Sequence, residues 1–399
     1  MKRRDFLLTA FGAAALQRCS WAADLPRDVT IARIVGFTLP TKRNKIAGKN
    51  SHLDVHGDRS GDRMVRLFTN AGLEGLGNCR ADEKALASLL GKDPFALYQP
   101  SERRMTGPLG VGTMPLWDLA GKALKKPAWE LLGGAGPERV PVYDGSIYMQ
   151  DLLPQHADRW ADRFKVEIDM GMGLGHRAFK IKIGRGFKWM PQEAGDARDA
   201  EVVQLIRRHA GPDVVLGVDS NNGHDLARTK RFLEAVPGAN LAFLEEMFPE
   251  NIEQYTDLRR FLADRRLKAL IADGENWGAP EDARPFVDAK VVDVYQGDMN
   301  RFGFEGVLAA AALAAGQGFT IGPHNWGSLV GFYMQLHAGR AVPNFYRAEH
   351  DPLESDVLLA DAYVIREGRV YVPDAPGFGL AIDEAQFAAT IKPAFDLKA

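Results

Sequence analysis

The chain has 399 residues, of which 46% are hydrophobic and 26% are charged, and its formal net charge is −2. This composition is that of an ordinary globular protein with enough apolar residues for a large core in about two or three domains. The net charge is nearly neutral and no basic stripe is present, so we expect no nucleic-acid partner.

The first 22 residues have the features of an export signal. The opening MKRR is basic, an apolar stretch follows over residues 6–16, and small residues precede a possible cleavage site. The arginine pair indicates a twin-arginine signal, with a general secretory signal as the alternative. We therefore expect a periplasmic or secreted protein with no stable membrane insertion after removal of residues 1–22. Cys19 would leave with the signal, so Cys79 would have no intrachain disulfide partner.

Residues 28–139 are predicted to form an α+β domain. The stretches VTIARIVGFTLP and RMVRLFTNAGLEGLGNC indicate strands, the second folded back at a turn around residues 70–72. Residues 41–62 lie between them and are polar, Gly-rich and without periodicity, which is typical of a functional or a disordered loop. Helical segments follow and end in LWDLAGKALKKPAWELLGG at residues 116–134.

From residue 140 to residue 365, short apolar strands alternate with segments of helix length. The strands are predicted at residues 140–146, 178–184, 214–220, 241–246, 268–275, 291–298, 318–324 and 344–349. Eight strands and seven intervening helices predict an α/β fold, a (β/α) barrel. The tail at residues 366–399 has no further unit to build, so we expect it to pack on the amino-terminal domain.

Acidic side chains end three consecutive predicted strands. Asp219, Glu245 and Glu275 follow one another at intervals of one strand and one helix. The carboxyl ends of barrel strands meet at one mouth, where three carboxylates would repel one another without a cation between them. An all-oxygen ligand set favours Mg²⁺. For any one of these residues, a solvated acid is the alternative.

Basic side chains accompany these acids. In FKIKIG, strand alternation places Lys180 and Lys182 on one face, either for catalysis or on the wet face of an edge strand. Each ammonium group, together with a nearby cation, is expected to lower the pKa of the other lysine, which a lysine base requires. His324 ends the seventh strand, and Asp298, one strand earlier, is placed to fix its tautomer. Glu349 ends the eighth strand and, if protonated, would bond an enolate oxygen.

This constellation resembles the enolase superfamily and, within it, the mandelate racemase subgroup. The similar stretches are LWDLAGKALKKPAWELLGG, KIK, VDSNNG, LEE, GENW, QGD and PHNWG, together with Glu349. The resemblance covers nearly all of the mature chain and implies a modified TIM barrel, (β/α)7β, with an α+β capping domain. The muconate-lactonising subgroup is less similar, because it usually has a lysine where Asp298 stands and an aspartate where Glu275 stands.

The resemblance also implies a role for each of these residues. Asp219, Glu245 and Glu275 would bind Mg²⁺, although Glu246 is an alternative ligand because Met247 and Phe248 separate LEE from the usual proline. The implied catalytic residues are Lys182 as base on one face, Lys180 orienting the substrate carboxylate, His324 with Asp298 on the other face, and Glu349 assisting enolate formation. Asn221, Tyr143 and His52 are further expected substrate contacts, and residues 41–62 would close over the substrate.

The predicted function is Mg²⁺-dependent removal of the α-proton of a small carboxylate, with dehydration of an acid sugar to a 2-keto-3-deoxy acid. The alternatives are a racemase or epimerase of a 2-hydroxy acid, because bases would stand on both faces, and a non-catalytic periplasmic binding protein. Relatives often assemble, so a homo-oligomer is expected. Most relatives are cytoplasmic, so the export signal is unusual.

Overall fold

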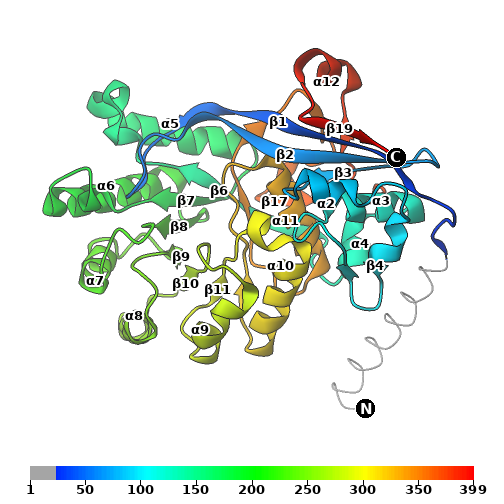
Figure 1. Ribbon diagram of the computed structural model, residues 1–399. Coiled ribbons are helices and arrows are strands. Elements are labelled where there is room, and N and C mark those ends of the chain that lie inside the picture. Colours follow the sequence, from blue (N-terminus) through cyan, green and yellow to red (C-terminus); the bar gives the residue numbers. More distant parts are fainter. Residues whose placement is uncertain (1–23) are drawn as a thin grey trace.

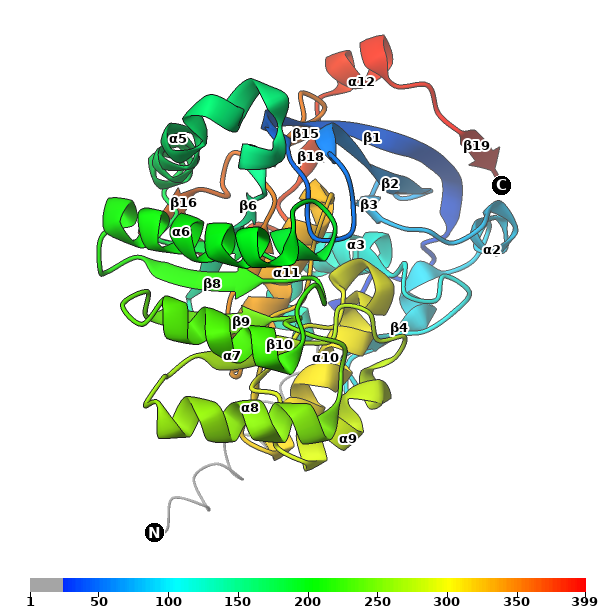
Figure 2. The same cartoon turned by 90° about the vertical axis from the view of Figure 1, so that its left-hand side faces the viewer.

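The computed structural model describes residues 24–399, and the predicted signal at residues 1–22 lies outside the described residues. Figures 1 and 2 show a barrel of strands with helices around it and a smaller unit of strands and short helices beside one end of the barrel. No helix within residues 24–399 is long and apolar enough to cross a lipid bilayer.

The smaller unit is built on an antiparallel sheet. Its strands are β1 (Ile31–Ala47), β2 (Gly57–Thr69) and β3 (Glu74–Asn78), with β14 (Leu353–Glu354) and β19 (Phe395–Lys398) paired to β1. Helices α2 (Glu83–Ala87), α3 (Met114–Leu124) and α4 (Ala128–Leu132) follow β3. Helix α3 crosses β3 so closely that a Cβ atom at Gly77 would lie 2.6 Å from Met114. A glycine is therefore required where the helix meets the sheet.

The loop predicted at residues 41–62 is much shorter in the structure. Strand β1 continues to Ala47 and β2 begins at Gly57, which leaves residues 48–56 as the connection. Side chains of β1 alternate between buried and exposed up to Ala47, but the buried ones include Arg43 and Lys45. Both lie inside because of ion pairs, Arg43 with Asp351 and Lys45 with Glu167. Charged residues on the buried face concealed the strand periodicity.

The larger unit is the predicted barrel. Its strands are β6 (Arg139–Ile147), β7 (Ala178–Lys182), β8 (Val215–Asp219), β9 (Leu241–Glu245), β10 (Leu270–Asp273), β11 (Val294–Tyr295), β12 (Thr320–Ile321) and β13 (Ala348–His350). Neighbouring strands run parallel from β6 to β12, and β13 pairs with β6 on the other side. A parallel bridge between Ile321 and Phe345 closes the ring. The α/β prediction is confirmed.

Seven helical segments alternate with the barrel strands and lie outside them (Figure 2). They are α5 (Trp160–Gly173), α6 (Gln192–Ala210), α7 (Leu226–Ala235), α8 (Ile252–Asp264), α9 (Arg284–Asp288), α10 (Met299–Gly316) and α11 (Leu329–Ala341). Capping residues fix where several of these helices begin. Asp225, Asn251, Asp298 and Ser328 each accept a hydrogen bond from a backbone N–H of the first turn.

Strand β7 carries the FKIKIG sequence, and the edge-strand alternative for it is wrong. It lies between β6 and β8, and all five of its residues are buried. Phe179 and Ile181 belong to an apolar cluster with residues of the surrounding helices. Because side chains alternate along a strand, Lys180 and Lys182 point to the other face, into the barrel.

The carboxyl-terminal tail contacts both units. A hairpin of β16 (Ile365–Arg366) and β17 (Arg369–Tyr371) first extends the barrel sheet, with β17 antiparallel to β6. Helix α12 (Glu384–Thr390) then leads to β19 on the capping sheet. The tail therefore begins on the barrel and ends on the smaller unit, the contact that the sequence predicts.

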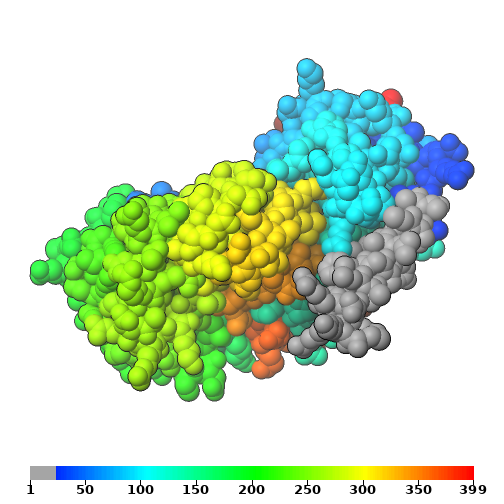
Figure 3. Space-filling view, turned by 90° about the horizontal axis from the view of Figure 1, so that it is seen from below, coloured from blue at the N-terminus to red at the C-terminus, as the bar shows by residue number. Residues whose placement is uncertain are grey.

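The two units also meet through buried polar contacts. Figure 3 shows the cyan residues of the smaller unit against the yellow segment that contains α10. There, the Glu305 carboxylate of α10 accepts hydrogen bonds from the Trp117 indole at 3.0 Å and the Thr113 hydroxyl at 2.8 Å. These contacts fix the smaller unit relative to the barrel.

Candidate active site

The three predicted acids meet at the carboxyl ends of the barrel strands. Asp219 and Glu245 end β8 and β9 and lie opposite one another in the parallel register. One carboxylate oxygen each of Asp219, Glu245 and Glu275 can be chosen so that all three lie within 4.8 Å of one another. Asp219 and Glu245 are buried, and Glu275 is partly exposed. We call this set the acidic triad.

The end of β10 explains why Glu275, and not Asp273, joins the triad. Asp273 ends the strand and bonds the Tyr255 hydroxyl, and its burial raises its pKa to about 8. Gly274 then adopts a left-handed conformation with φ of 120°, where a side chain would collide with Trp277. This turn after the strand brings Glu275 to the mouth.

Lys180 lies among the carboxylates. Its Nζ bonds Glu245 and lies 2.7 Å from Glu349 Oε1 and 3.2 Å from Asp219 Oδ2. Burial lowers the pKa of Lys180, but Glu245 and Glu349 outweigh burial and raise this pKa well above its usual value. The predicted lowering is therefore wrong for Lys180, because the sequence did not show how many carboxylates would surround it.

Lys182 lies toward the Asp219 side of the triad. Its Nζ donates to Asp219 and, at 2.8 Å, to Asn221 Oδ1, and the residue is 5% exposed. The same Nζ lies 5.5 Å from the centre of the Tyr148 ring. A lysine with both polar partners and a ring beneath it is held in one direction, as a base must be.

His324 lies at the opposite side of the triad, beside Glu275. Its Nδ1 is 2.7 Å from Asp298 Oδ2, the pairing that the sequence predicts, and its Nε2 is 3.4 Å from Glu275 Oε2. Burial lowers the pKa of His324, but Glu275 and Asp298 outweigh burial and raise it to about 10. Asp298 is itself fixed because it also caps α10 through the Arg301 N–H. The cap at the start of α10 therefore fixes the direction of the His324 imidazole through Asp298.

Glu349 is the central residue of β13 and lies between the two sides. Its Oε1 contacts Lys180, and its Oε2 accepts a hydrogen bond of 2.9 Å from the Asn325 backbone N–H. Asn325 directly follows His324, so Glu349 connects the loop that carries His324 to Lys180. Its role as a hydrogen-bond donor to an enolate stays a prediction.

The residues of the triad fit a hard divalent cation. All three offer oxygen atoms, the ligand type that Mg²⁺ prefers. The Glu275 Oε2 atom is buried and makes no hydrogen bond. This atom lies 3.4 Å from His324 Nε2 without the geometry of a hydrogen bond, and Glu275 stands beside the two other carboxylates, so the carboxylate remains open to a ligand.

The three expected substrate contacts have different surroundings. Asn221 bonds Lys182 and belongs to the site. Tyr143 lies in the barrel interior with Lys180 Nζ 5.7 Å from its ring centre, and its hydroxyl is buried without a hydrogen-bond partner. His52 is on the exposed rim, where its ring lies 4.3 Å from that of Phe187.

Several residues beside the site were not identified from the sequence. Gln296 donates a hydrogen bond of 2.6 Å to Glu245 Oε2 and so orients a triad member. It stands two residues before Asp298 in QGD, and strand alternation could have indicated it. The rings of His56, Tyr148 and Trp326 pack against one another, with centres 4.8 to 5.7 Å apart, and Tyr148 contacts Lys182. No sequence pattern connects them.

A second cluster of possible ligands lies outside the barrel mouth. Asp196, Asp199 and His224 also offer atoms within 4.8 Å of one another. However, Arg185 donates to Asp199 at 2.6 Å and Arg228 donates to Asp196. The arginines already neutralise both carboxylates, so this cluster supports the fold and does not resemble a metal centre.

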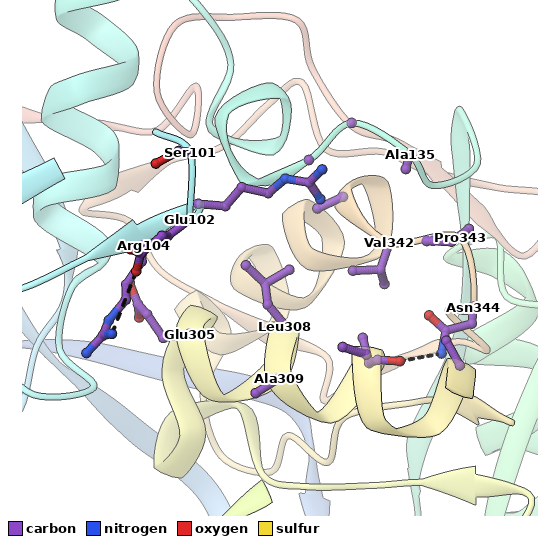
Figure 4. Close-up of a pocket in the computed structure, with 17 residues that line it drawn as sticks. Ser101, Glu102, Arg104, Ala135, Glu305, Leu308, Ala309, Val342, Pro343 and Asn344 are labelled. Carbon is purple, nitrogen blue, oxygen red and sulfur yellow. Dashed lines mark hydrogen bonds and ion pairs between the residues drawn. The ribbon is translucent and has the colours of Figure 1, made fainter. Parts of the chain in front are cut away.

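A groove of about 760 Å³ runs along α10 and is also lined by residues 101–104, 133–135 and 341–344. Figure 4 shows Leu308 and Ala309 of α10 on one side and Val342 and Pro343 on another. Val342 and Pro343 precede β13, whose central residue is Glu349. The groove is largely apolar and is separate from the candidate active site.

The geometry agrees with comparisons to known proteins. A family model described as "Enolase C-terminal domain-like" matches residues 165–386. The chain is 27% identical to D-galactarolactone cycloisomerase of Agrobacterium fabrum over 82% of this chain and 90% of that protein. It is 25% identical to a D-galactonate dehydratase family member of Streptomyces bingchenggensis over 80% of this chain and 87% of that protein.

Solved structures of sugar-acid dehydratases are also similar to this chain. A galacturonate dehydratase mutant from Geobacillus sp., complexed with Mg, superposes with a TM-score of 0.85 at 30% identity, covering 92% of this chain and 96% of that one. Galacturonate dehydratase from Geobacillus sp. complexed with D-galacturonate and 5-keto-4-deoxy-D-galacturonate has a TM-score of 0.83 at 30% identity, covering 92% and 97%.

Proposed function

We propose that this chain, which belongs to the Enolase C-terminal domain-like family of the enolase superfamily, is a Mg²⁺-dependent dehydratase of acid sugars. One observation carries the proposal: Asp219, Glu245 and Glu275 converge between a lysine on one side and a histidine–aspartate pair on the other. The relatives named as dehydratases support the reaction class, and the solved relative complexed with Mg supports the cofactor.

The chain's own residues divide the chemistry between the two sides of the triad. When bound by the triad, Mg²⁺ supplies positive charge beside the substrate carboxylate, where negative charge accumulates as the α-proton leaves. Lys180, buried at the triad, holds that carboxylate in place. Lys182 takes the α-proton at its Nζ, and Asn221 keeps this atom aimed. Glu349 stands beside Lys180, where the enolate oxygen is expected.

His324 completes the elimination from the other side. The electrons of the α C–H bond form a carbon–carbon double bond, and the β C–O bond breaks. His324 Nε2 donates a proton to the departing hydroxyl, which leaves as water, while Asp298 stabilises the charged imidazole through Nδ1. The resulting enol tautomerises to a 2-keto-3-deoxy acid.

Two other reactions use the same groups. A racemase would return the proton from His324 to the opposite face of the α-carbon, because bases stand on both sides. A cycloisomerase, the name of one relative, would open or close a ring without net loss of water. A keto-deoxy product indicates the dehydratase. Inversion at the α-carbon indicates the racemase, and an isomer with a ring opened or closed indicates the cycloisomerase.

The test is a screen of aldonic, uronic and aldaric acids in D₂O, with Mg²⁺ and then with a chelator. We expect one or more acids to yield a 2-keto-3-deoxy product by NMR only when Mg²⁺ is present. Turnover that persists at full rate in the chelator would contradict the metal dependence. Binding of acids without proton exchange or turnover across the panel would indicate the binding-protein alternative.

We further propose that the protein is exported to the periplasm or secreted through the twin-arginine signal at residues 1–22. The sequence MKRRDFLL supports this. Replacing Arg3 and Arg4 with lysine is expected to retain the protein in the cytoplasm, as measured by fractionation. Assembly into a homo-oligomer stays a prediction, which light scattering of the purified protein would test.

A further inference from the structure

A buried carboxylate next to the triad has no role in the proposed reaction. Glu246 directly follows Glu245 and is 2% exposed. Its Oε1 accepts hydrogen bonds from the side-chain amides of Asn276 at 2.6 Å and Asn222 at 3.3 Å, and its Oε2 accepts one from Asn221 at 3.0 Å. Within residues 24–399, its hydrogen-bond donors are therefore neutral amides, and Glu246 is not a triad member.

These amides come from the loops on both sides of β9. Asn221 stands two residues after Asp219, beyond the end of β8, and Asn276 directly follows Glu275, beyond the end of β10. Glu246 therefore bridges the loop that directly follows Asp219 and the loop that carries Glu275.

The backbone around Glu246 is strained in a way that the bridge explains. Glu246 has a φ of 43°, and Asn221 and Asn222 have φ of 42° and 61°. Asparagine tolerates this left-handed region, but glutamate rarely occupies it. The Asn222 N–H donates to the Glu246 carbonyl at 2.6 Å, so backbone and side-chain contacts hold the two strand ends together. Such strain persists only where surrounding contacts fix the conformation, and it concentrates at functional sites.

The bridge also reaches Lys182. The Asn221 amide accepts from Lys182 Nζ through Oδ1 and donates to Glu246 through Nδ2. If the Asn221 side-chain amide were rotated by half a turn, its NH₂ group would face the Lys182 ammonium and its oxygen would face the Glu246 carboxylate. Glu246 thus fixes which end of Asn221 faces the lysine.

We propose that Glu246 is a positioning residue that holds Asp219 and Glu275 at the spacing a divalent cation requires and orients Asn221 toward Lys182. This inference rests on the proposed function, because it assigns the triad to Mg²⁺. It also explains why two glutamates follow one another at the end of β9: the first belongs to the triad and the second holds the neighbouring loops.

The experiment measures Mg²⁺ affinity by calorimetry on the mature chain and its variants. In Glu246→Ala the whole bridge is lost, and we expect affinity to fall about 10- to 100-fold, as for other residues that orient metal ligands. In Asn276→Ala, at an exposed position, only the link to the Glu275 loop is lost. We expect this variant to fold and its affinity to fall about three- to tenfold, less than in Glu246→Ala, because the links to Asn221 and Asn222 remain.

Glu305→Gln is the matched control. Glu305 also accepts hydrogen bonds from neutral groups, the Met105 N–H, the Thr113 hydroxyl and the Trp117 indole, but it lies on α10 in contact with the smaller unit. We expect this variant to lower the unfolding temperature and to leave Mg²⁺ affinity within about twofold, since it does not orient a metal ligand.

Turnover gives a second measurement. Because Glu246 acts through Lys182 and the triad, we expect kcat in Glu246→Ala and Asn276→Ala to fall by more than KM changes. Mg²⁺ affinity within twofold of wild type in Asn276→Ala and in any folded Glu246→Ala would overturn the inference. A wild-type chain that neither binds Mg²⁺ nor turns over any acid would instead contradict the proposed function.

Discussion

Two clusters within residues 24–399 bring three potential ligands within 4.8 Å, and they differ in what surrounds them. The acidic triad at the barrel mouth is bonded by two lysines and faces a histidine. The second cluster, Asp196, Asp199 and His224, is bonded by Arg185 and Arg228. The same spacing of ligand atoms therefore occurs in a candidate catalytic centre and in a structural ion-pair network.

The difference shows that the partners of an acidic cluster indicate its role better than its spacing does. Arginine stays protonated and binds carboxylates with a rigid fork, so it neutralises them permanently. Lysine is a point charge on a flexible four-carbon chain, so it can move away from a carboxylate when a cation binds. Glu275 also keeps an oxygen without a hydrogen bond. A cation can therefore enter the triad, while the arginines exclude it from the second cluster.

Removal of a triad carboxylate is expected to have the largest effect and tests whether the triad is the metal site. In Glu275→Gln, we expect turnover to fall on the order of 10⁴-fold, because the metal no longer stabilises charge at the substrate. Stability should not fall, because one of three repelling carboxylates is gone. Turnover by NMR and calorimetry with Mg²⁺ measure these effects. Wild-type turnover in the folded variant would exclude the triad as the metal site.

Removal of the lysine base should have the next largest effect. In Lys182→Ala, we expect kcat to fall about 10²- to 10⁴-fold, the usual contribution of a general base. Mg²⁺ affinity should change much less, because all three triad carboxylates remain. Lys230→Ala, on α7 and paired with Asp257, is the control lysine and should retain wild-type kcat. An equal loss of kcat in both variants would contradict a specific role for Lys182.

The second cluster should respond in stability and not in catalysis. Arg185 is fully buried between Asp151 and Asp199, at 2.7 and 2.6 Å. In Arg185→Met, two buried carboxylates lose their partner, and we expect the free energy of unfolding to fall by about 3 to 5 kcal/mol. Urea denaturation measures it. In the folded fraction, Mg²⁺ affinity should match wild type, and a loss of affinity would connect the two clusters.

A further test of the difference between the two clusters is the effect of added Mg²⁺ on stability. At a concentration 100 times its Kd, a ligand that binds only the folded state stabilises it by about 2.7 kcal/mol. We expect Mg²⁺ to raise the unfolding temperature of the wild type and not that of Glu275→Gln. If both proteins were stabilised equally, the cation would be binding outside the triad.

The barrel and the triad could be predicted from sequence because their signals are local. Each triad acid ends or closely follows its own strand, and the interval between Asp219, Glu245 and Glu275 repeats with the strand–helix unit. The pairing of His324 with Asp298 follows from the same rule, since both lie just beyond the ends of neighbouring strands. What the sequence showed, then, was the order of strand ends around the mouth.

The errors arose where distant residues decide the outcome. At residues 41–47 the sequence predicts a loop and the structure has strand β1, because Arg43 is buried by a partner 308 positions away. The sequence predicts a lowered pKa for Lys180, whereas Glu245 and Glu349, both distant in the chain, raise this pKa. The sequence predicts His52 as a substrate contact, but His56 of the same loop is the histidine that contacts Tyr148, and residues 48–56 carry no periodicity that would distinguish the two.

The smallest expected effect concerns the rim of the second cluster, where Asp196 bonds Arg228. The Asp196 side chain is 24% exposed, so water partly screens the pair. In Asp196→Asn, we expect the free energy of unfolding to fall by about 1 kcal/mol, near the upper value for exposed pairs, because the contact involves two guanidinium nitrogens. Urea denaturation at low and high salt measures the loss, and high salt should diminish it.

Asp196→Asn also tests whether the second cluster contributes to Mg²⁺ binding. Arg228 keeps its hydrogen bond of 2.7 Å to the Gly223 carbonyl, so the loop after β8 should hold its position when the Asp196 charge is lost. Mg²⁺ affinity and kcat should then stay within about twofold of wild type, because a surface pair contributes little beyond its own contact. If Asp196→Asn weakened Mg²⁺ binding tenfold, the second cluster would be holding the cation despite its arginines, and partners could no longer distinguish the two clusters.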